Sequence, residues 1–105
     1  MNKRIAIFSL CAILALPAAA FAHSPIFDCA DNGDGTISCE GGFSDGSSAS
    51  GVKIHVMDAS GSIIEELALD KNSELTFKKP AVDYKVQFDA GAGHQVTIDG
   101  KKIVQ

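Results

Sequence analysis

A pair of cysteines flanking a turn constrains the fold of this chain more than any other feature of its sequence. Cys29 and Cys39 enclose ADNGDGTIS, whose Asn-Gly and Asp-Gly pairs supply the positive φ angles of a tight hairpin turn. If the turn centres on Asp34, residues whose numbers sum to 68 face each other, and the two cysteines are direct cross-strand neighbours. We therefore predict a structural disulfide, which stabilises the folded state by about 3 kcal/mol by closing a loop of about 11 residues.

The first 22 residues have the three parts of a secretory signal peptide. Lys3 and Arg4 form a basic start, residues 5–16 form an apolar run, and the Ala-Phe-Ala at residues 20–22 is an A-x-A cleavage site. The apolar run is shorter than the roughly 20 residues that a membrane-spanning helix needs. We therefore predict that residues 1–22 are a cleaved signal peptide and that the protein is periplasmic or secreted.

The predicted mature chain, residues 23–105, has 83 residues, enough for one small domain. Removal of the signal peptide, and of Cys11 with it, leaves seven basic side chains against 13 acidic ones, a formal charge of −6. Nucleic acids and anionic membranes both require a cationic footprint, so we expect neither as a partner. The exported compartment permits the two remaining cysteines to pair.

The rest of the mature chain alternates short β-rich runs with turns. Apolar residues alternate over 52–57, 84–88 and 95–98, and further β-rich runs cover 62–69 and 75–77. The 62–69 run is also compatible with a helix. Short strands at about ten-residue spacing predict an all-β fold, a small antiparallel immunoglobulin-like or transthyretin-like β-sandwich with a disulfide-bonded hairpin at its N-terminal end.

The inward positions of these strands predict the hydrophobic core. The Ser- and Gly-rich segment 44–51 is expected to be an exposed connection. The expected core residues are Ile26, Ile37, Phe43, Val52, Ile54, Val56, Leu67, Leu75, Phe77, Tyr84, Val86, Phe88, Val96 and Ile98.

Residues 40–80 combine the β-rich run GVKIHV, the turn DASG and a second turn leading into an aromatic strand, in this order. This pattern resembles carboxypeptidase-regulatory-like and related transthyretin-like sandwich modules. With FDAGAGHQVTIDG, residues 88–100, the chain is also similar to the small periplasmic accessory domain found beside nickel and cobalt uptake transporters. The resemblance implies a sandwich fold, and an exported or transporter protein as a partner. Members often have a C-terminal membrane helix, whereas this chain ends in KKIVQ, so we expect no membrane anchor.

The predicted cleavage places His23 at the new N-terminus, where its α-amine and Nδ1 can close a chelate ring on a metal ion. The amine has an unperturbed pKa near 8, so losing its proton to a metal at neutral pH costs little. A second histidine completes a histidine brace, whose three nitrogens suit copper(II) or nickel(II). Pro25 excludes the other common N-terminal copper site, because that site needs a histidine at position three and amide hydrogens before it.

His94 is the best candidate for the second histidine. It follows Gly91-Ala92-Gly93, which lets the backbone bend tightly, so we expect His94 at the mouth of a turn before a strand. The alternative is that His23 is merely the residue left by cleavage and His94 an ordinary turn residue. His55 alternates with apolar neighbours and is expected on a solvated strand face; a copper(I) pair with Met57 is the less favoured interpretation.

Two other kinds of site are not supported by the sequence. Residues 31–35 resemble part of a calcium loop, but its first and twelfth positions would be Ala30 and Gly41. No serine lies in a nucleophile elbow or beside a plausible base. We therefore expect a protein that is not an enzyme.

Two functions follow from these observations. The first is a small exported protein that binds copper, or nickel or cobalt, through His23 and His94 for metal handling or delivery. The second is a non-catalytic protein–protein interaction module of the carboxypeptidase-regulatory-like type. The distance between His23 and His94 distinguishes them, because a shared metal requires the two side chains to meet.

Overall fold

Seven β-strands and one short 3₁₀ turn make up the part of the chain that the computed structural model describes, residues 23–105. The predicted signal peptide, residues 1–22, lies outside the described residues. The elements in chain order are β1 (Pro25–Asp31), β2 (Thr36–Phe43), β3 (Lys53–Asp58), β4 (Ile63–Ala68), β5 (Glu74–Lys78), β6 (Tyr84–Asp89), β7 (Gln95–Asp99) and η1 (Gly100–Lys102).

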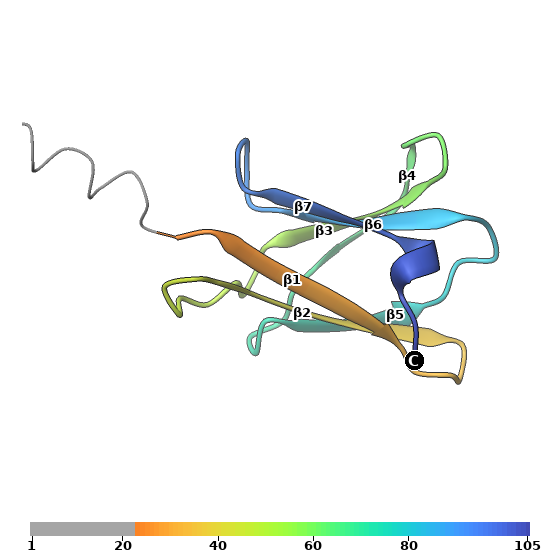
Figure 1. The fold of residues 1–105 in the computed structure, drawn as a ribbon, viewed down its shortest axis with the longest axis horizontal. Helices are drawn as coiled ribbons and strands as arrows, with labels where there is room; N and C mark the ends of the chain where they lie inside the picture. Colours follow the sequence, from red (N-terminus) through yellow and green to blue (C-terminus); the bar gives the residue numbers. More distant parts are fainter. Residues whose placement is uncertain (1–22) are drawn as a thin grey trace, which may run out of the picture.

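The strands form two antiparallel sheets that face each other (Figure 1). One sheet has the order β1-β2-β5 and the other the order β4-β3-β6-β7. In a constant-type immunoglobulin domain the fourth strand belongs to the sheet of strands one, two and five. Here β4 instead forms the edge beside β3. The predicted small antiparallel β-sandwich is confirmed, and the ambiguous run at 62–69 forms a strand.

The N-terminal hairpin has the predicted register. The numbers of paired residues sum to 68 throughout, from the pair Pro25–Phe43 to the pair Asp31–Ile37. Cys29 lies opposite Cys39 and is disulfide-bonded to it. Gly33 and Gly35 in the connecting turn have φ angles of 77° and 92°, which side chains disfavour. The disulfide and the turn therefore fix the pairing of β1 with β2.

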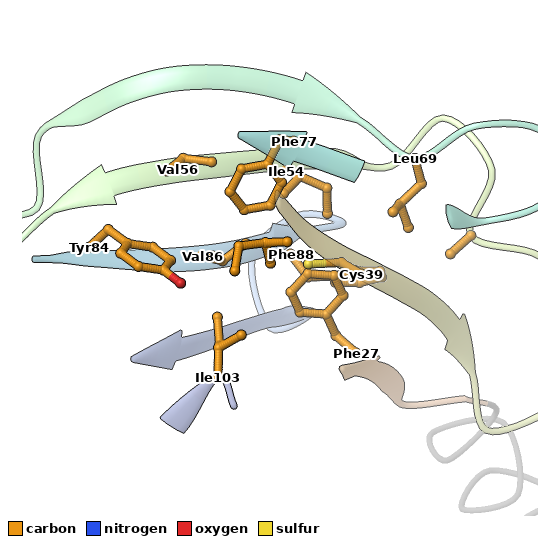
Figure 2. Close-up of a cluster of buried hydrophobic side chains, with 12 residues drawn as sticks. Phe27, Cys39, Ile54, Val56, Leu69, Phe77, Tyr84, Val86, Phe88 and Ile103 are labelled. Carbon is orange, nitrogen blue, oxygen red and sulfur yellow. The ribbon is translucent and has the colours of Figure 1, made fainter. Parts of the chain in front are cut away.

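The core lies between the two sheets, and Figure 2 shows its side chains gathered around Phe88. Residues at alternate positions of β2, β3 and β6 are fully buried, because each of these strands has a neighbour on both sides. The buried apolar residues are Phe27, Ile37, Cys39, Ala49, Ile54, Val56, Leu69, Phe77, Tyr84, Val86, Phe88 and Ile103. The remaining expected core residues other than Ile26 are partly buried and pack against this cluster.

Ile26 was expected in the core, and this prediction is wrong. Ile26 is 57% exposed, and its neighbour Phe27 is buried instead. Side chains alternate between the two faces of a strand, so placing Phe27 inward turns Ile26 outward. Ala49, within the segment expected to be an exposed connection, is also buried.

Segments far apart in the sequence meet at one end of the sandwich. Figure 1 shows the beginning of β1, the β2–β3 connection and the β6–β7 hairpin at the end opposite the C-terminus. The candidate metal ligands belong to the first and last of these three segments. The fold therefore places both of them at the same end.

Candidate functional site

His23 lies just before β1, and the β1–β2 hairpin holds it in place. The backbone N–H of Ser44 donates to the carbonyl oxygen of Ser24 at 2.8 Å, and the backbone N–H of Ser24 donates to Ser44 Oγ at 2.7 Å. These bonds extend the hairpin register by one pair, since 24 and 44 also sum to 68. Beyond this pair the chain turns at residues 43–46, which places Asp45 near His23.

The His23 ring packs on an aromatic stack that leads into the core. Its centroid lies 5.6 Å from that of Phe43 in an edge-to-face arrangement, and Phe43 lies 5.8 Å from Phe88 in the same way. Such aromatic pairs are favourable beyond the apolar area they bury. The ring is thus positioned by packing, while its side chain remains 43% exposed.

His94 closes the β6–β7 hairpin. Its backbone N–H donates to the carbonyl oxygen of Gly91 at 2.9 Å, and its carbonyl oxygen accepts from the N–H of Ala90 at 3.1 Å. Gly91 and Gly93 have φ angles of 110° and 82°, as this tight turn requires. His94 therefore lies directly before β7, as the sequence predicted.

The structure brings His23 and His94 together. Their ring centroids are 5.9 Å apart and their planes are inclined by 34°. Two imidazoles bound to one ion at about 2 Å per metal–nitrogen bond have centroids about 4.5 Å apart in a cis arrangement and about 6.3 Å apart in a trans arrangement. The observed separation falls between these two values.

Asp45 is a third member of this cluster that the sequence analysis missed. Its Oδ2 lies 3.5 Å from Nδ1 of His23, and its Oδ1 accepts the backbone N–H and the hydroxyl of Ser47 at 2.9 and 2.6 Å. The Ser47 hydrogen bonds, with a smaller effect of His23, hold the pKa of Asp45 below its ordinary value of 3.8. Asp45 therefore carries a negative charge at neutral pH. The predicted hairpin register could have indicated that Asp45 lies near His23, because 23 and 45 sum to 68, as the numbers of the paired residues do.

Side chains alone do not complete a metal site here. Among residues 23–105, no group of three or more His, Cys, Asp or Glu side chains is arranged to hold a metal ion. The histidine brace draws its third nitrogen from the α-amine of the first residue, and that amine is free only if the chain begins at His23. A metal site at this end therefore depends on the predicted cleavage after Ala22.

His55 differs from its predicted environment. It lies on the outer face of the four-stranded sheet, yet only 8% of it is exposed, so the predicted solvated strand face is wrong. Its Nε2 lies 3.1 Å from Oδ2 of Asp89, and its Nδ1 is buried without a hydrogen-bond partner among the described residues. β3 is a central strand, and the facing residues Glu66 and Gln87 on the strands beside it flank the imidazole. This environment also disfavours the copper(I) pair with Met57.

Asp89 connects buried His55 to the hairpin that carries His94. Its Oδ1 accepts the backbone N–H of Gly91 and Nε2 of Gln95, each at 3.0 Å, while its Oδ2 faces His55. Hydrogen bonds from Gln95, Gly91 and His55, in decreasing order of effect, lower the pKa of Asp89. Asp89 thus fastens both sides of the turn that presents His94.

The described part of the chain contains no helix that is long and apolar enough to cross a lipid bilayer. Comparison of the chain with protein-family models, with curated proteins and with solved structures finds no match. The resemblance to accessory domains of metal transporters therefore stays a prediction.

Proposed function

We propose that this protein is an exported, non-enzymatic metal-binding protein that holds copper(II), or alternatively nickel(II) or cobalt(II), and passes it to a partner. The α-amine and Nδ1 of His23 and the imidazole of His94 would be the ligands. The observation that carries the proposal is the 5.9 Å separation of the two imidazoles, which come from distant parts of the sequence.

The chemistry of these donors favours late first-row divalent ions. An amine and two imidazoles are nitrogen donors of the kind that copper and nickel prefer, and copper(II) has the highest affinity in the divalent series. Binding displaces the proton of the terminal ammonium group, whose ordinary pKa near 8 makes this loss inexpensive at neutral pH. The exposure of His23 leaves the ion accessible for transfer to a partner.

Cleavage of the signal peptide would create the site. In the uncleaved chain the nitrogen of His23 belongs to a peptide bond with Ala22 and cannot serve as an amine ligand. The site would therefore form only on export, in the compartment where the disulfide also forms. This coupling would keep the precursor from binding metal through the brace.

The alternative is a protein–protein interaction module, and one feature of the structure favours it. Ile63 and Ile64 on the edge strand β4 are exposed, as is Val82 in the β5–β6 connection. An exposed apolar edge strand is a surface on which another chain can add a strand. This alternative predicts that His23 and His94 variants capture partners as well as the wild type.

Titration of the chain that begins at His23 with copper(II) tests the proposal. We expect one ion per chain with nanomolar or tighter affinity, measured by competition with a chelator of known affinity. His94→Ala is expected to weaken binding by at least about a hundredfold, because one of three nitrogen donors is lost.

The matched control is the chain beginning at His23 with its α-amine acetylated. This chain has the same side chains and the same hairpin, but its histidine nitrogen is an amide, so we expect copper(II) binding at least about a hundredfold weaker. Equal affinity of the two chains would contradict the brace, and full binding by His94→Ala would contradict the role of His94.

A further inference from the structure

Asp45 is fixed beside His23 by the architecture of the hairpin. Hydrogen bonds between Ser24 and Ser44 continue the β1–β2 pairing and hold His23 beside the turn at residues 43–46, which contains Asp45. Ser47 occupies Oδ1 with two hydrogen bonds, and this leaves Oδ2 directed at Nδ1 of His23 at 3.5 Å. One carboxylate oxygen is therefore used by the turn and the other faces the histidine.

The atom that Oδ2 faces is the one that a terminal histidine uses in chelation. The α-amine and Nδ1 of the same residue close the chelate ring, so a metal ion would take the position of a proton on Nδ1. Nδ1 and Oδ2 are 3.5 Å apart, so an ion about 2 Å from Nδ1 lies within direct or water-mediated reach of the carboxylate. Asp45 thus places a negative charge beside the ion.

We propose that Asp45 makes this site selective for a divalent, oxidised ion, so that it holds copper(II) in preference to copper(I). The proposal rests on the function proposed above and adds the oxidation state of the metal that the site selects.

Charge and donor type both lead to this preference. The attraction between a carboxylate and a cation scales with the charge of the cation, so it is about twice as large for copper(II) as for copper(I). Oxygen and nitrogen donors in tetragonal geometry suit copper(II), whereas copper(I) favours thiolates and thioethers. Both cysteines of the described chain are joined in the disulfide, so neither supplies a thiolate to this end.

A second aspartate of the same hairpin provides a matched control. Asp34 lies in the β1–β2 turn, and its Oδ1 accepts the backbone N–H and the hydroxyl of Thr36 at 3.0 and 2.6 Å. Asp45 makes the same two bonds with Ser47, which is also two residues further along the chain. Replacing either aspartate by asparagine removes one charge from an equivalent turn, but only Asp45 is beside His23.

The experiment compares the chain beginning at His23 with its Asp45→Asn and Asp34→Asn variants. Copper(II) and copper(I) affinities are measured separately, the latter without oxygen against a chromophoric copper(I) chelator. We expect Asp45→Asn to weaken copper(II) binding about tenfold and copper(I) binding only about threefold, because the carboxylate attracts the singly charged ion about half as strongly. The ratio of the copper(II) affinity to the copper(I) affinity then falls about threefold, which raises the midpoint potential of the bound copper by about 30 mV. Asp34→Asn should match the wild type.

The possible outcomes separate this inference from the proposed function. If the wild type binds copper(II) tightly but Asp45→Asn matches it in both affinities, the role of Asp45 is refuted and the brace stands. If Asp45→Asn weakens both oxidation states equally, Asp45 has a structural role and the selectivity is refuted. If the wild type does not bind copper(II), both proposals fail. Thermal unfolding of each variant confirms that the fold is retained.

Discussion

The structure of residues 23–105 contains two histidine–aspartate pairs, and they differ in burial and in how accessible the histidine is. His23 and Asp45, at the end of the sandwich, are 3.5 Å apart and have 43% and 38% of their side chains exposed. His55 and Asp89, on the outer face of the four-stranded sheet, are 3.1 Å apart with 10% and 24% exposed. The same two residue types thus occur once in an open site and once in a closed one.

Burial, and not residue type, distinguishes the two pairs. The His55 ring is enclosed by its own sheet, and the Asp89 carboxylate is already engaged by Gly91 and Gln95. The His23 ring is held from one side by Phe43 and remains accessible on the other. We therefore expect the closed pair to contribute to stability and the open pair to metal binding.

Removing the disulfide should have the largest effect. The double variant Cys29→Ala/Cys39→Ala is expected to lose about 3 kcal/mol of unfolding free energy, because the unfolded chain is no longer restricted by the closed loop. Urea denaturation measures this loss. An unchanged urea midpoint would contradict it.

Loss of the disulfide in Cys29→Ala/Cys39→Ala should affect amide hydrogen exchange near the two histidine–aspartate pairs unequally. The Ser44 amide, bonded to Ser24 beside the open pair, should exchange its hydrogen faster, because the disulfide no longer holds β1 against β2. The Gly91 amide, bonded to Asp89 in the other sheet, serves as the internal control. Equal acceleration at both amides would show that the disulfide does not act locally on the open pair.

Replacing the histidine of each pair by alanine should have an intermediate effect. The variant of the buried histidine should lose mainly stability, and the variant of the exposed histidine should lose mainly copper(II) affinity. His55→Ala is expected to cost about 2 kcal/mol of unfolding free energy, from lost packing and a lost buried hydrogen bond. His23→Ala should cost less, about 0.5 to 1 kcal/mol, because its half-exposed ring contributes one aromatic contact with Phe43. Copper(II) affinity should fall at least about a hundredfold in His23→Ala and remain within a few fold in His55→Ala.

His55→Gln separates the two contributions of the buried histidine. The glutamine amide can still donate to Asp89, so this variant should be more stable than His55→Ala if the hydrogen bond contributes. Similar losses of stability in His23→Ala and His55→Ala would mean that the two pairs do not differ as proposed.

The smallest effect should be a pH dependence at the closed pair. Hydrogen bonds from Gln95, Gly91 and His55 lower the pKa of Asp89 below its ordinary value of 3.8. A carboxylate with a depressed folded-state pKa stabilises the fold above its unfolded pKa, and this contribution is lost as the pH falls through the folded value. Asp89→Asn should therefore be less stable than the wild type at pH 6, and the difference should shrink below pH 3.8.

Thermal unfolding midpoints measured from about pH 6 to about pH 2 test this dependence. The other aspartates with lowered pKa values are present in both proteins, so they contribute equally to both curves. A constant difference between the two curves over this range would show that the Asp89 charge does not stabilise the fold.

The sequence was sufficient for features that depend on local order. The Asn-Gly and Asp-Gly pairs identified the turn, and the turn centre fixed the register that opposes Cys29 and Cys39. The glycines before His94 indicated the hairpin that the structure contains. These features were predictable because turn chemistry and cross-strand register involve residues close together in the chain.

The sequence failed where burial depends on distant strands. Alternation placed His55 on the outer face correctly, but its burial depends on β4 and β6, the strands on either side of β3. The pattern of β1 did not distinguish Ile26 from Phe27, because the face that meets the other sheet is set only when the sheets pack.

The sequence by itself therefore determined the disulfide-bonded hairpin, the all-β class of the fold and the choice of His23 and His94 as candidate metal ligands. Only the tertiary structure decided that the rings of His23 and His94 lie 5.9 Å apart and that His55 is buried. The physical reason is that register and turns are local properties, whereas the meeting of a chain terminus with the β6–β7 hairpin depends on how two sheets pack.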